Sequence, residues 1–324
     1  MKTIVPNYYP KFSCIAGACH HSCCVGWEID IDPESLARFR VVPGAIGVRL
    51  KESICENADG ACFCLDEDER CPFLNGDGLC DLILELGEDC LCQSCADHPR
   101  YRNFFSDREE IGLGLCCEAA ARLILEQAEP VRMIVLEDDG GDCALSGDEA
   151  FILHLRTSAI SALQNRSLRF EERVDDMLRA LHMPQLRFHL PDWAAFLLDL
   201  ERLDDVWTDR LQALSSAPSL PLPCVPETET AFEQLAVYLL TRHLPGALED
   251  GDIAGRIACA VLILHLINAL CAVEIEKKGA FRMDDLVEIA RMYSSEIEYS
   301  DENLYAILDE LHRVFPELRS IPFQ

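Results

Sequence analysis

The sequence predicts a mainly α protein, in which a cysteine-rich metal-binding N-terminal region of short helices and loops precedes an all-helical C-terminal domain. Two observations lead to this fold class. Fourteen of the 18 cysteines lie between Cys14 and Cys117, and amphipathic helical periodicity dominates from about residue 148 onward. With 324 residues, 49% of them apolar, the chain is long enough for two domains.

The N-terminal region contains few long periodic segments. Its first clear helix starts at Asp32-Pro33-Glu34-Ser35, where Asp is a favourable N-cap and Pro suits the first helical position. This helix is predicted to run through Phe39, and a second helix begins near Cys116. We expect bound metal, rather than a packed core, to hold the loops between them.

A strand-like run, residues 131–136, is followed by a break at Asp138-Asp139-Gly140-Gly141-Asp142. The break predicts a cysteine-rich metal or iron–sulfur domain over residues 1–140 and a helical domain over residues 148–324. A Pro-rich piece from Ser215 to Pro226 is predicted to be a linker or surface loop. The helical domain contains seven predicted amphipathic stretches: residues 148–164, 170–182, 191–213, 229–244, 252–278, 283–295 and 301–315.

The net charge of −29 argues against nucleic acid as a partner, because phosphate contacts need clustered Lys and Arg. It favours a basic partner, such as a lysine-bearing protein surface, or simply confers solubility. The most apolar run, Ile257 to Val273, contains His265 and Asn268 and falls short of the roughly 20 residues of a membrane span. We therefore predict a buried core helix and no membrane span. His265, like His243, is predicted to be a satisfied core or surface histidine.

The crowding of cysteines needs a local chemical cause, and disulfides compete with metal binding. The N-terminus, Met1 to Pro10, lacks the apolar run of a signal peptide, so we expect a cytoplasmic protein. The cytosol keeps thiols reduced, and clustered cysteines there act as metal ligands or redox groups more often than as disulfides. The sequence therefore favours metal.

The cysteines of the N-terminal region form four clusters: Cys14-x4-Cys19-x3-Cys23-Cys24, Cys71 with Cys80, Cys90 with Cys92 and Cys95, and the pair Cys116-Cys117. All-thiolate ligation suits zinc or an iron–sulfur cluster, and the spacing does not choose between them. A redox pair at Cys92 and Cys95 is an alternative, but no βαβ pattern surrounds it. The histidines near these clusters, His20, His21 and His98, are further candidate ligands.

Particular strings carry more information than the spacing alone. In the N-terminal region they are Phe12-Ser13-Cys14-Ile15, Cys23-Cys24-Val25-Gly26-Trp27, Ile29-Asp30-Ile31-Asp32, Cys71-Pro72-Phe73-Leu74, Gly78-Leu79-Cys80, Cys95 with Pro99-Arg100, and Cys116 with Glu118-Ala119-Ala120. In the helical half they are Ala236-Val237-Tyr238, Arg242-His243, Asp250-Gly251-Asp252 and the run from Tyr293 to Leu304. These strings, spread over nearly the whole chain, resemble the flagellin lysine-N-methylase family, which is itself similar to a broader family of cysteine-rich zinc- or iron-chelating proteins.

The resemblance implies an enzyme, a protein-lysine N-methyltransferase that acts on flagellin with S-adenosylmethionine as methyl donor and a 4Fe-4S cluster. Zinc is the alternative metal, and a non-catalytic zinc- or iron-chelating protein is the alternative function. The metal ligands that the resemblance implies are Cys14, Cys19, Cys23, Cys24, Cys71, Cys80, Cys95 and Cys116.

Two features of this ligand set stay open. Cys117 stands where the family more often has proline, which makes it an alternative ligand to Cys116. Eight thiolates exceed the four that one cubane needs, so either two centres exist or some of these cysteines are structural. The sequence identifies neither a catalytic base nor a site for S-adenosylmethionine, and Tyr101, beside the third cluster, is the residue to test as a base.

Overall fold

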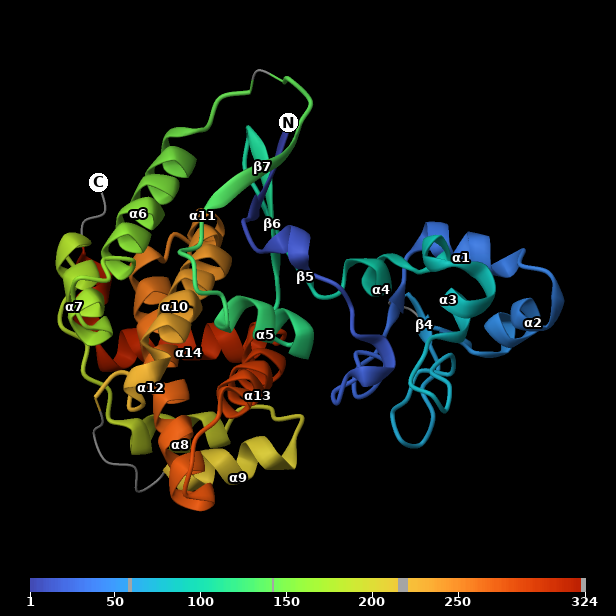
Figure 1. Cartoon of the computed structure of the whole chain (residues 1–324). Helices are drawn as coiled ribbons and strands as arrows, with labels where there is room; N and C mark the ends of the chain where they lie inside the picture. Colours follow the sequence, from blue (N-terminus) through green and yellow to red (C-terminus); the bar gives the residue numbers. More distant parts are fainter. Residues whose placement is uncertain (58–59, 142, 215–220, 322–324) are drawn as a thin grey trace. The chain divides into compact units, whose positions relative to one another are not determined.

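The computed structural model describes residues 1–57, 60–141, 143–214 and 221–321, and it is mainly helical (Figure 1). The chain divides into two compact units. The helical unit comprises Met1–Phe12, Arg102–Cys116 and Ala120–Gln324, and the cysteine unit comprises Ser13–Tyr101 and Cys117–Ala119. Each unit is described by itself below. Whether residues 1–140 and 148–324 are separate domains stays a prediction.

A four-stranded sheet combines the first strand of the chain with three strands from residues 100–138. Its order is β5 (Arg100–Phe104), β6 (Arg108–Leu113), β1 (Lys2–Pro6) and β7 (Met133–Asp138). Strand β1 runs parallel to β6 and antiparallel to β7. The strand predicted over residues 131–136 is confirmed as β7, shifted by two residues, whereas the other three strands were not predicted.

The helices of the helical unit follow the predicted amphipathic stretches closely. They are α5 (Glu118–Leu125, which begins in the cysteine unit), α6 (Gly147–Leu163), α7 (Phe170–Ala180), α8 (Leu190–Leu198), α9 (Asp205–Ala213), α10 (Glu229–His243), α11 (Ala247–Asp250), α12 (Ile253–Lys278), α13 (Met283–Tyr293) and α14 (Asp301–Val314). One prediction was wrong: residues 191–213 form two helices. The Asp204 side chain accepts a hydrogen bond from the Val206 amide and starts α9 as a separate helix. Of the predicted Pro-rich loop, residues 215–220 lie outside the described residues.

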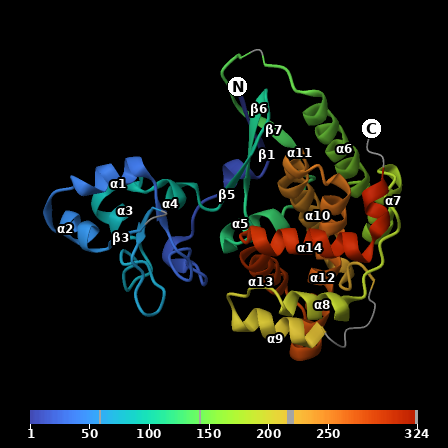
Figure 2. The same cartoon turned by 180° about the vertical axis from the view of Figure 1, so that it is seen from behind.

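Helix α12 is the core of the helical unit. Its length and composition fit a membrane span, but 89% of its most apolar window is buried inside the protein. Figures 1 and 2 both place it among α8, α10, α13 and α14. Asp252 caps its first turn, and Gly279, with φ +72°, ends it in the left-handed conformation. The predicted buried core helix is confirmed.

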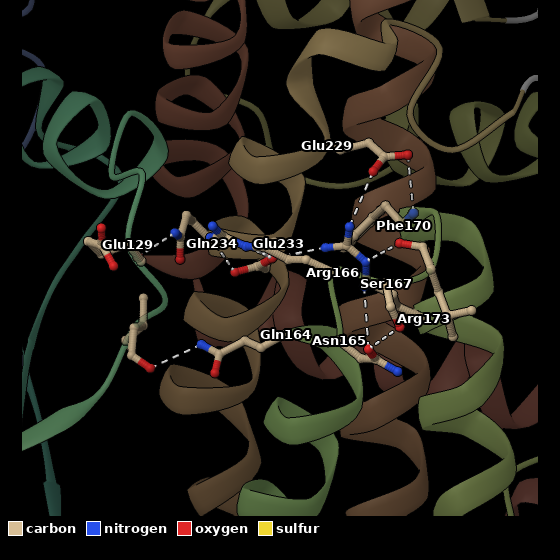
Figure 3. A network of polar contacts seen from close by, with 12 residues as sticks. Glu129, Gln164, Asn165, Arg166, Ser167, Phe170, Arg173, Glu229, Glu233 and Gln234 are labelled. Atoms are coloured by element: carbon tan, nitrogen blue, oxygen red, sulfur yellow. Dashed lines mark hydrogen bonds and ion pairs between the residues drawn. The ribbon is translucent and has the colours of Figure 1, made fainter.

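A buried ion network fixes α7 against α10 (Figure 3). The Glu233 carboxylate is fully buried and accepts hydrogen bonds of 2.9 Å from both Arg166 Nε and Arg173 Nη1. Arg173 also bonds to Glu229 at 3.2 Å. A buried carboxylate needs such complete pairing, so the network sets where the face of α7 lies relative to the rest of the helical unit.

The cysteine unit has a small sheet and a hydrophobic core of its own. The sheet has the order β2 (Asp30–Ile31), β4 (Ala61–Phe63) and β3 (Ile54–Glu56), and the helices are α1 (Pro33–Arg40), α2 (Gly44–Glu52), α3 (Asp81–Leu86) and α4 (Gln93–Asp97). Phe39, Leu50, Phe63 and Phe73 are almost completely buried together. The expectation that metal, rather than a packed core, holds these loops was therefore wrong, because aromatic and aliphatic side chains form such a core.

Asp32 caps two helices with one carboxylate. Oδ1 accepts from the Ser35 amide in α1, and Oδ2 accepts from the Gln93 amide in α4, both at 2.9 Å. The first contact confirms the helix start that the sequence predicts, whereas the second joins segments 61 residues apart.

We expect Asp32→Ala to destabilise α1 and α4 together by about 2 kcal/mol, since each lost cap costs about 0.5–2 kcal/mol. Asp32→Asn keeps one acceptor oxygen and is expected to lose about half as much. Hydrogen exchange of the α1 and α4 amides in the full chain measures the effect. Loss of protection in α1 alone would show that the Gln93 contact contributes nothing.

Candidate metal centre and a buried polar network

Six free cysteines, which we call the core thiols, gather against the hydrophobic core of the cysteine unit. They are Cys24, Cys71, Cys80, Cys90, Cys92 and Cys95. Their proximity shows in their mutual electrostatic effect. Burial and then the charges of Cys24, Cys80 and Cys92 raise the pKa of Cys71 to about 12. Four of the eight predicted ligands therefore lie in one group: Cys24, Cys71, Cys80 and Cys95. The other two core thiols, Cys90 and Cys92, were not among the predicted ligands.

Backbone pairing explains how distant cysteines meet. The Cys71 amide donates to the Cys24 carbonyl at 2.8 Å, beside an isolated bridge between Val25 and Arg70. A second bridge pairs Leu74 with Cys80, directly before α3. The residue before α4 is Cys92, and Cys95 lies in its first turn. Two turns and two helix starts thus direct these thiols toward the same core.

Two thiol pairs within the cysteine unit are hydrogen bonded. The Cys95 thiol donates to Cys92, which lowers the pKa of Cys92 to about 7 and raises that of Cys95. The Cys23 thiol donates to Cys24 and lowers the pKa of Cys24 to about 7 in the same way. Because the thiolate is the form that ligates a metal, each pair presents one sulfur that ionises near neutral pH. Cys92, which the family resemblance left out of the ligand set, is one of them.

A second group, the outer thiols, comprises Cys14, Cys19, Cys23 and Cys117. The charges of Cys14 and Cys117 both raise the pKa of Cys23, and Cys117 raises that of Cys19. Cys19 Sγ also donates to the His21 carbonyl at 3.2 Å. The group contains the three remaining N-terminal predicted ligands together with the alternative ligand Cys117.

Glu118 occupies the edge of the outer thiols. It pairs with His20 Nδ1 at 3.0 Å and accepts a hydrogen bond from Cys19 at 3.7 Å. His20 is thus engaged with a carboxylate through one of its ring nitrogens. Another candidate histidine, His98, lies with its ring centre 6.0 Å from that of Trp27, and burial lowers its pKa to about 4, so it is neutral at neutral pH.

Cys116, the eighth predicted ligand, lies in the helical unit rather than with the other thiols. Its thiol forms a hydrogen bond with the Tyr299 hydroxyl. A disulfide joins Cys55 to Cys64, and neither of these cysteines is among the predicted ligands. Cys143 is exposed and far from either group in sequence.

The thiol groups fit a metal centre in part. Their all-sulfur donor chemistry suits zinc or an iron–sulfur cluster. Within the described ranges, however, no three His, Cys, Asp or Glu side chains stand in the positions that a bound ion requires. The thiols would have to approach one another further to share a metal, so the structure supports the donor set and not its coordination geometry.

A buried polar network in the helical unit is a second candidate site, which the sequence did not predict. The fully buried Glu298 carboxylate accepts hydrogen bonds from Tyr238 Oη at 2.7 Å, Ser294 Oγ at 2.5 Å and His243 Nε2 at 2.6 Å. Arg242 Nη1 lies 3.7 Å away. An ionised carboxylate only accepts hydrogen bonds, so His243 carries its proton on Nε2.

The Glu298 network lies on an irregular element and reaches the surface. Ser294–Glu298 is a π-helix, a form often found at functional sites. The Arg242 guanidinium lies 4.9 Å from the centre of the Tyr299 ring, and Tyr299 is half exposed. The string Arg242-His243 and the run that contains Glu296-Ile297-Glu298 are among those that resemble the family. Only the fold shows that Arg242 and His243 lie beside Glu298.

Comparison with known proteins finds a family that part of the chain resembles. Residues 177–321 match the family model of the FliB lysine N-methylase C-terminal domain. The predicted family resemblance is confirmed. The match to the FliB lysine N-methylase C-terminal domain includes every residue of the Glu298 network and excludes the cysteine unit.

Curated relatives agree with this family. The chain is 24% identical over 136 residues, 40% of its length, to the lysine-N-methylases of Salmonella typhimurium and Salmonella choleraesuis, and the match covers 33% of each relative. It has the same identity and coverage with the flagellar biosynthetic protein FliU of Salmonella muenchen, of which the match covers 79%. The matched part therefore spans about a third of the lysine-N-methylases. No solved structure matches the chain.

Proposed function

We propose that this chain is a cytoplasmic protein-lysine N-methyltransferase that acts on flagellin, with S-adenosylmethionine as methyl donor and a cysteine-ligated 4Fe-4S cluster. The observation that carries the proposal is the match of residues 177–321 to the FliB lysine N-methylase C-terminal domain. The names of the relatives, lysine-N-methylase and a flagellar biosynthetic protein, support methyl transfer and a flagellar substrate.

The core thiols are the best candidates to hold the cluster. Three of Cys24, Cys71, Cys80 and Cys95 would hold three irons of one cubane and leave the fourth iron free of thiolate, and Cys92 is a further candidate ligand. Such a cluster, when bound, supplies an iron centre that can hold the amino-acid part of S-adenosylmethionine. The chain's own task is to present a lysine as the neutral amine, because an ammonium group, with a pKa near 10.4 in water, has no lone pair to methylate.

The first test is the metal content of protein purified without oxygen, together with methyl transfer from S-adenosylmethionine to flagellin. Iron and acid-labile sulfide in equal amounts, with lysine methylation that disappears when the cluster is removed, is the expected result. Methylation that persists in cluster-free protein would contradict the role of the cluster. Absence of methylation by fully loaded protein would contradict the enzyme itself.

A non-catalytic zinc- or iron-chelating protein is the second candidate. One observation favours it: the thiols lie in a unit that the family match does not cover, so metal binding there does not require catalysis. Zinc without sulfide, and no methyl transfer, would favour this reading. A gene neighbourhood that contains flagellin would favour the methylase.

The adjacent cysteines Cys116 and Cys117 offer a matched pair for the ligand assignment. Cys117 belongs to the outer thiols, whereas Cys116 pairs with Tyr299. If the outer thiols hold a second metal centre, Cys117→Ser lowers the metal content and Cys116→Ser leaves it unchanged, as measured by metal analysis of the two variants side by side. The reverse result would show that Cys116, and not Cys117, is the metal ligand.

A further inference from the structure

A pocket of about 260 Å³ lies in the helical unit, between α7, α12 and the extended segment of residues 185–191. Helix α7 contributes one face with the spacing i, i+3, i+4 and i+7: Glu171, Val174, Asp175 and Leu178. Helix α12 contributes a matching face: Val261, His265, Asn268 and Ala269. The Glu233 ion network anchors α7, which forms one wall of the pocket.

The volume of this α7–α12 pocket limits what it can hold. Pockets for drug-sized ligands measure roughly 300–1,000 Å³, so 260 Å³ is small for a whole nucleoside-containing cofactor. It suits a single extended side chain that enters from the surface. The pocket's size therefore favours an amino-acid side chain over S-adenosylmethionine.

The lining has the character that a long cationic side chain needs. Val174, Leu178, Phe188 and Val261 supply apolar walls. Two carboxylates, Glu171 and Asp175, lie on the same face of α7. Opposite charges and an apolar channel together favour a stem of methylene groups that ends in a positive charge.

The segment of residues 185–191 adds the other charged groups. Arg187 is exposed, and His189 pairs with Asp192 at 2.9 Å. With the two carboxylates of α7 and the imidazole of α12, these are the titratable and charged groups among the described lining residues.

His265 is the unusual group in this pocket. It is the half-buried imidazole in an otherwise buried stretch of α12, its ring lies 5.6 Å from that of Phe188, and no described residue forms a hydrogen bond with it. The sequence predicts a satisfied core or surface histidine here, and the structure places this one at intermediate burial without a hydrogen bond to a described residue. Burial lowers its pKa, while Asp175 acts in the opposite direction, so the ring is neutral and has a lone pair to offer.

We infer that the α7–α12 pocket binds the acceptor lysine, with its methylene stem against Phe188 and its ammonium group between Asp175 and His265. The inference rests on the proposed function, since it names the place of the substrate side chain. The lysine ammonium gives one proton to an imidazole nitrogen of His265 and becomes an amine. That amine would be the nucleophile, and S-adenosylmethionine would supply its sulfonium methyl group and keep the S–C electron pair as the leaving thioether.

Kinetics of two variants in the full, metal-loaded chain test this assignment. We expect Asp175→Asn to raise KM for flagellin about tenfold, through loss of one charge contact. We expect His265→Gln to lower kcat by about 10²–10⁴-fold, and its residual rate to rise with pH toward the lysine pKa of about 10.4. A merely structural loss would not give this pH dependence.

Asp176→Asn and His154→Gln are the matched controls. Asp176 follows Asp175 on α7 but pairs with Arg179, and His154 is an exposed histidine on α6. Both are expected to keep the wild-type KM and kcat. Suppose that the wild type methylates flagellin and that Asp175→Asn and His265→Gln have the same KM and kcat as these controls. That result would contradict lysine binding in the α7–α12 pocket and leave the proposed function intact.

A binding experiment separates the pocket from the methylase activity. Protein labelled at histidine Cε1 is titrated with N-acetyl-lysine methylamide, and the His265 NMR signal, assigned from His265→Gln, is followed. A concentration-dependent shift with this probe, and none with the uncharged norleucine analogue, supports the pocket even if no methyl transfer occurs. No shift, or a shift with adenosine instead, would overturn it.

Discussion

Cys71→Ser is expected to remove most of the bound metal and to abolish methyl transfer. Cys71 is buried against Phe73 in the core of the cysteine unit, with Cys24, Cys80 and Cys92 around it. Serine is a poor ligand for iron and zinc, and loss of one thiolate leaves a cubane without a complete protein site. Iron, sulfide and zinc per chain, measured with the methylation rate, check this expectation.

Cys143→Ser is the control, because Cys143 is exposed and belongs to neither thiol group. It is expected to keep full metal content and full activity. Cys80→Ser provides a second ligand variant with less effect on folding, since Cys80 is only partly buried at the start of α3. If Cys71→Ser and Cys80→Ser both keep full metal, the core thiols are not the ligands.

The helices of this protein were predictable because their determinants are local. Asp32 and Pro33 determine the start of α1, and the 3.6-residue apolar period identifies six of the seven predicted stretches beyond residue 147 as single helices. The sheet was not predictable in the same way. Strand β1 pairs with β6 more than 100 residues away, and such non-local pairing leaves little mark on a five-residue strand.

The candidate site shows the same division between local and tertiary information. The strings around Cys14, Cys71 and Cys95 identified a thiol-rich region, and the spacing alone did not show which thiols are neighbours. Separation of Cys116 from Cys117 depends on the fold, because adjacent residues can belong to different units. The environment of His265 depends on α7 and on residues 185–191, which no periodicity of α12 reveals.

Glu298→Gln is expected to lower the free energy of unfolding of the helical unit by about 3–5 kcal/mol, because it leaves Arg242 without its buried counter-charge. The amide also presents a donor where Tyr238, Ser294 and His243 all donate. Urea unfolding at pH 7 measures the loss. Glu302→Gln, an exposed carboxylate on α14, is the control and is expected to change stability little.

The same variant changes how stability depends on pH. Burial raises the pKa of Glu298, but the Arg242 charge and the hydrogen bond from His243 outweigh it and hold the pKa at about 2. A carboxyl with a lowered pKa stabilises the fold above its unfolded value of about 4.3. That contribution disappears as the pH falls through about 2. The wild type should lose this stability between those values, and Glu298→Gln should lack this part of the acid dependence.

Stability and activity together distinguish scaffold from site. The Glu298 network lies entirely within the residues that match the FliB lysine N-methylase C-terminal domain and reaches the surface at Tyr299. If the network only stabilises the domain, Glu298→Gln should retain the wild-type kcat at temperatures where it is folded. If the network also positions Arg242 and Tyr299 for the reaction, kcat should fall in fully folded protein, and Tyr299→Phe should reproduce that fall without the loss of stability, because it removes one hydroxyl and leaves the buried carboxylate paired.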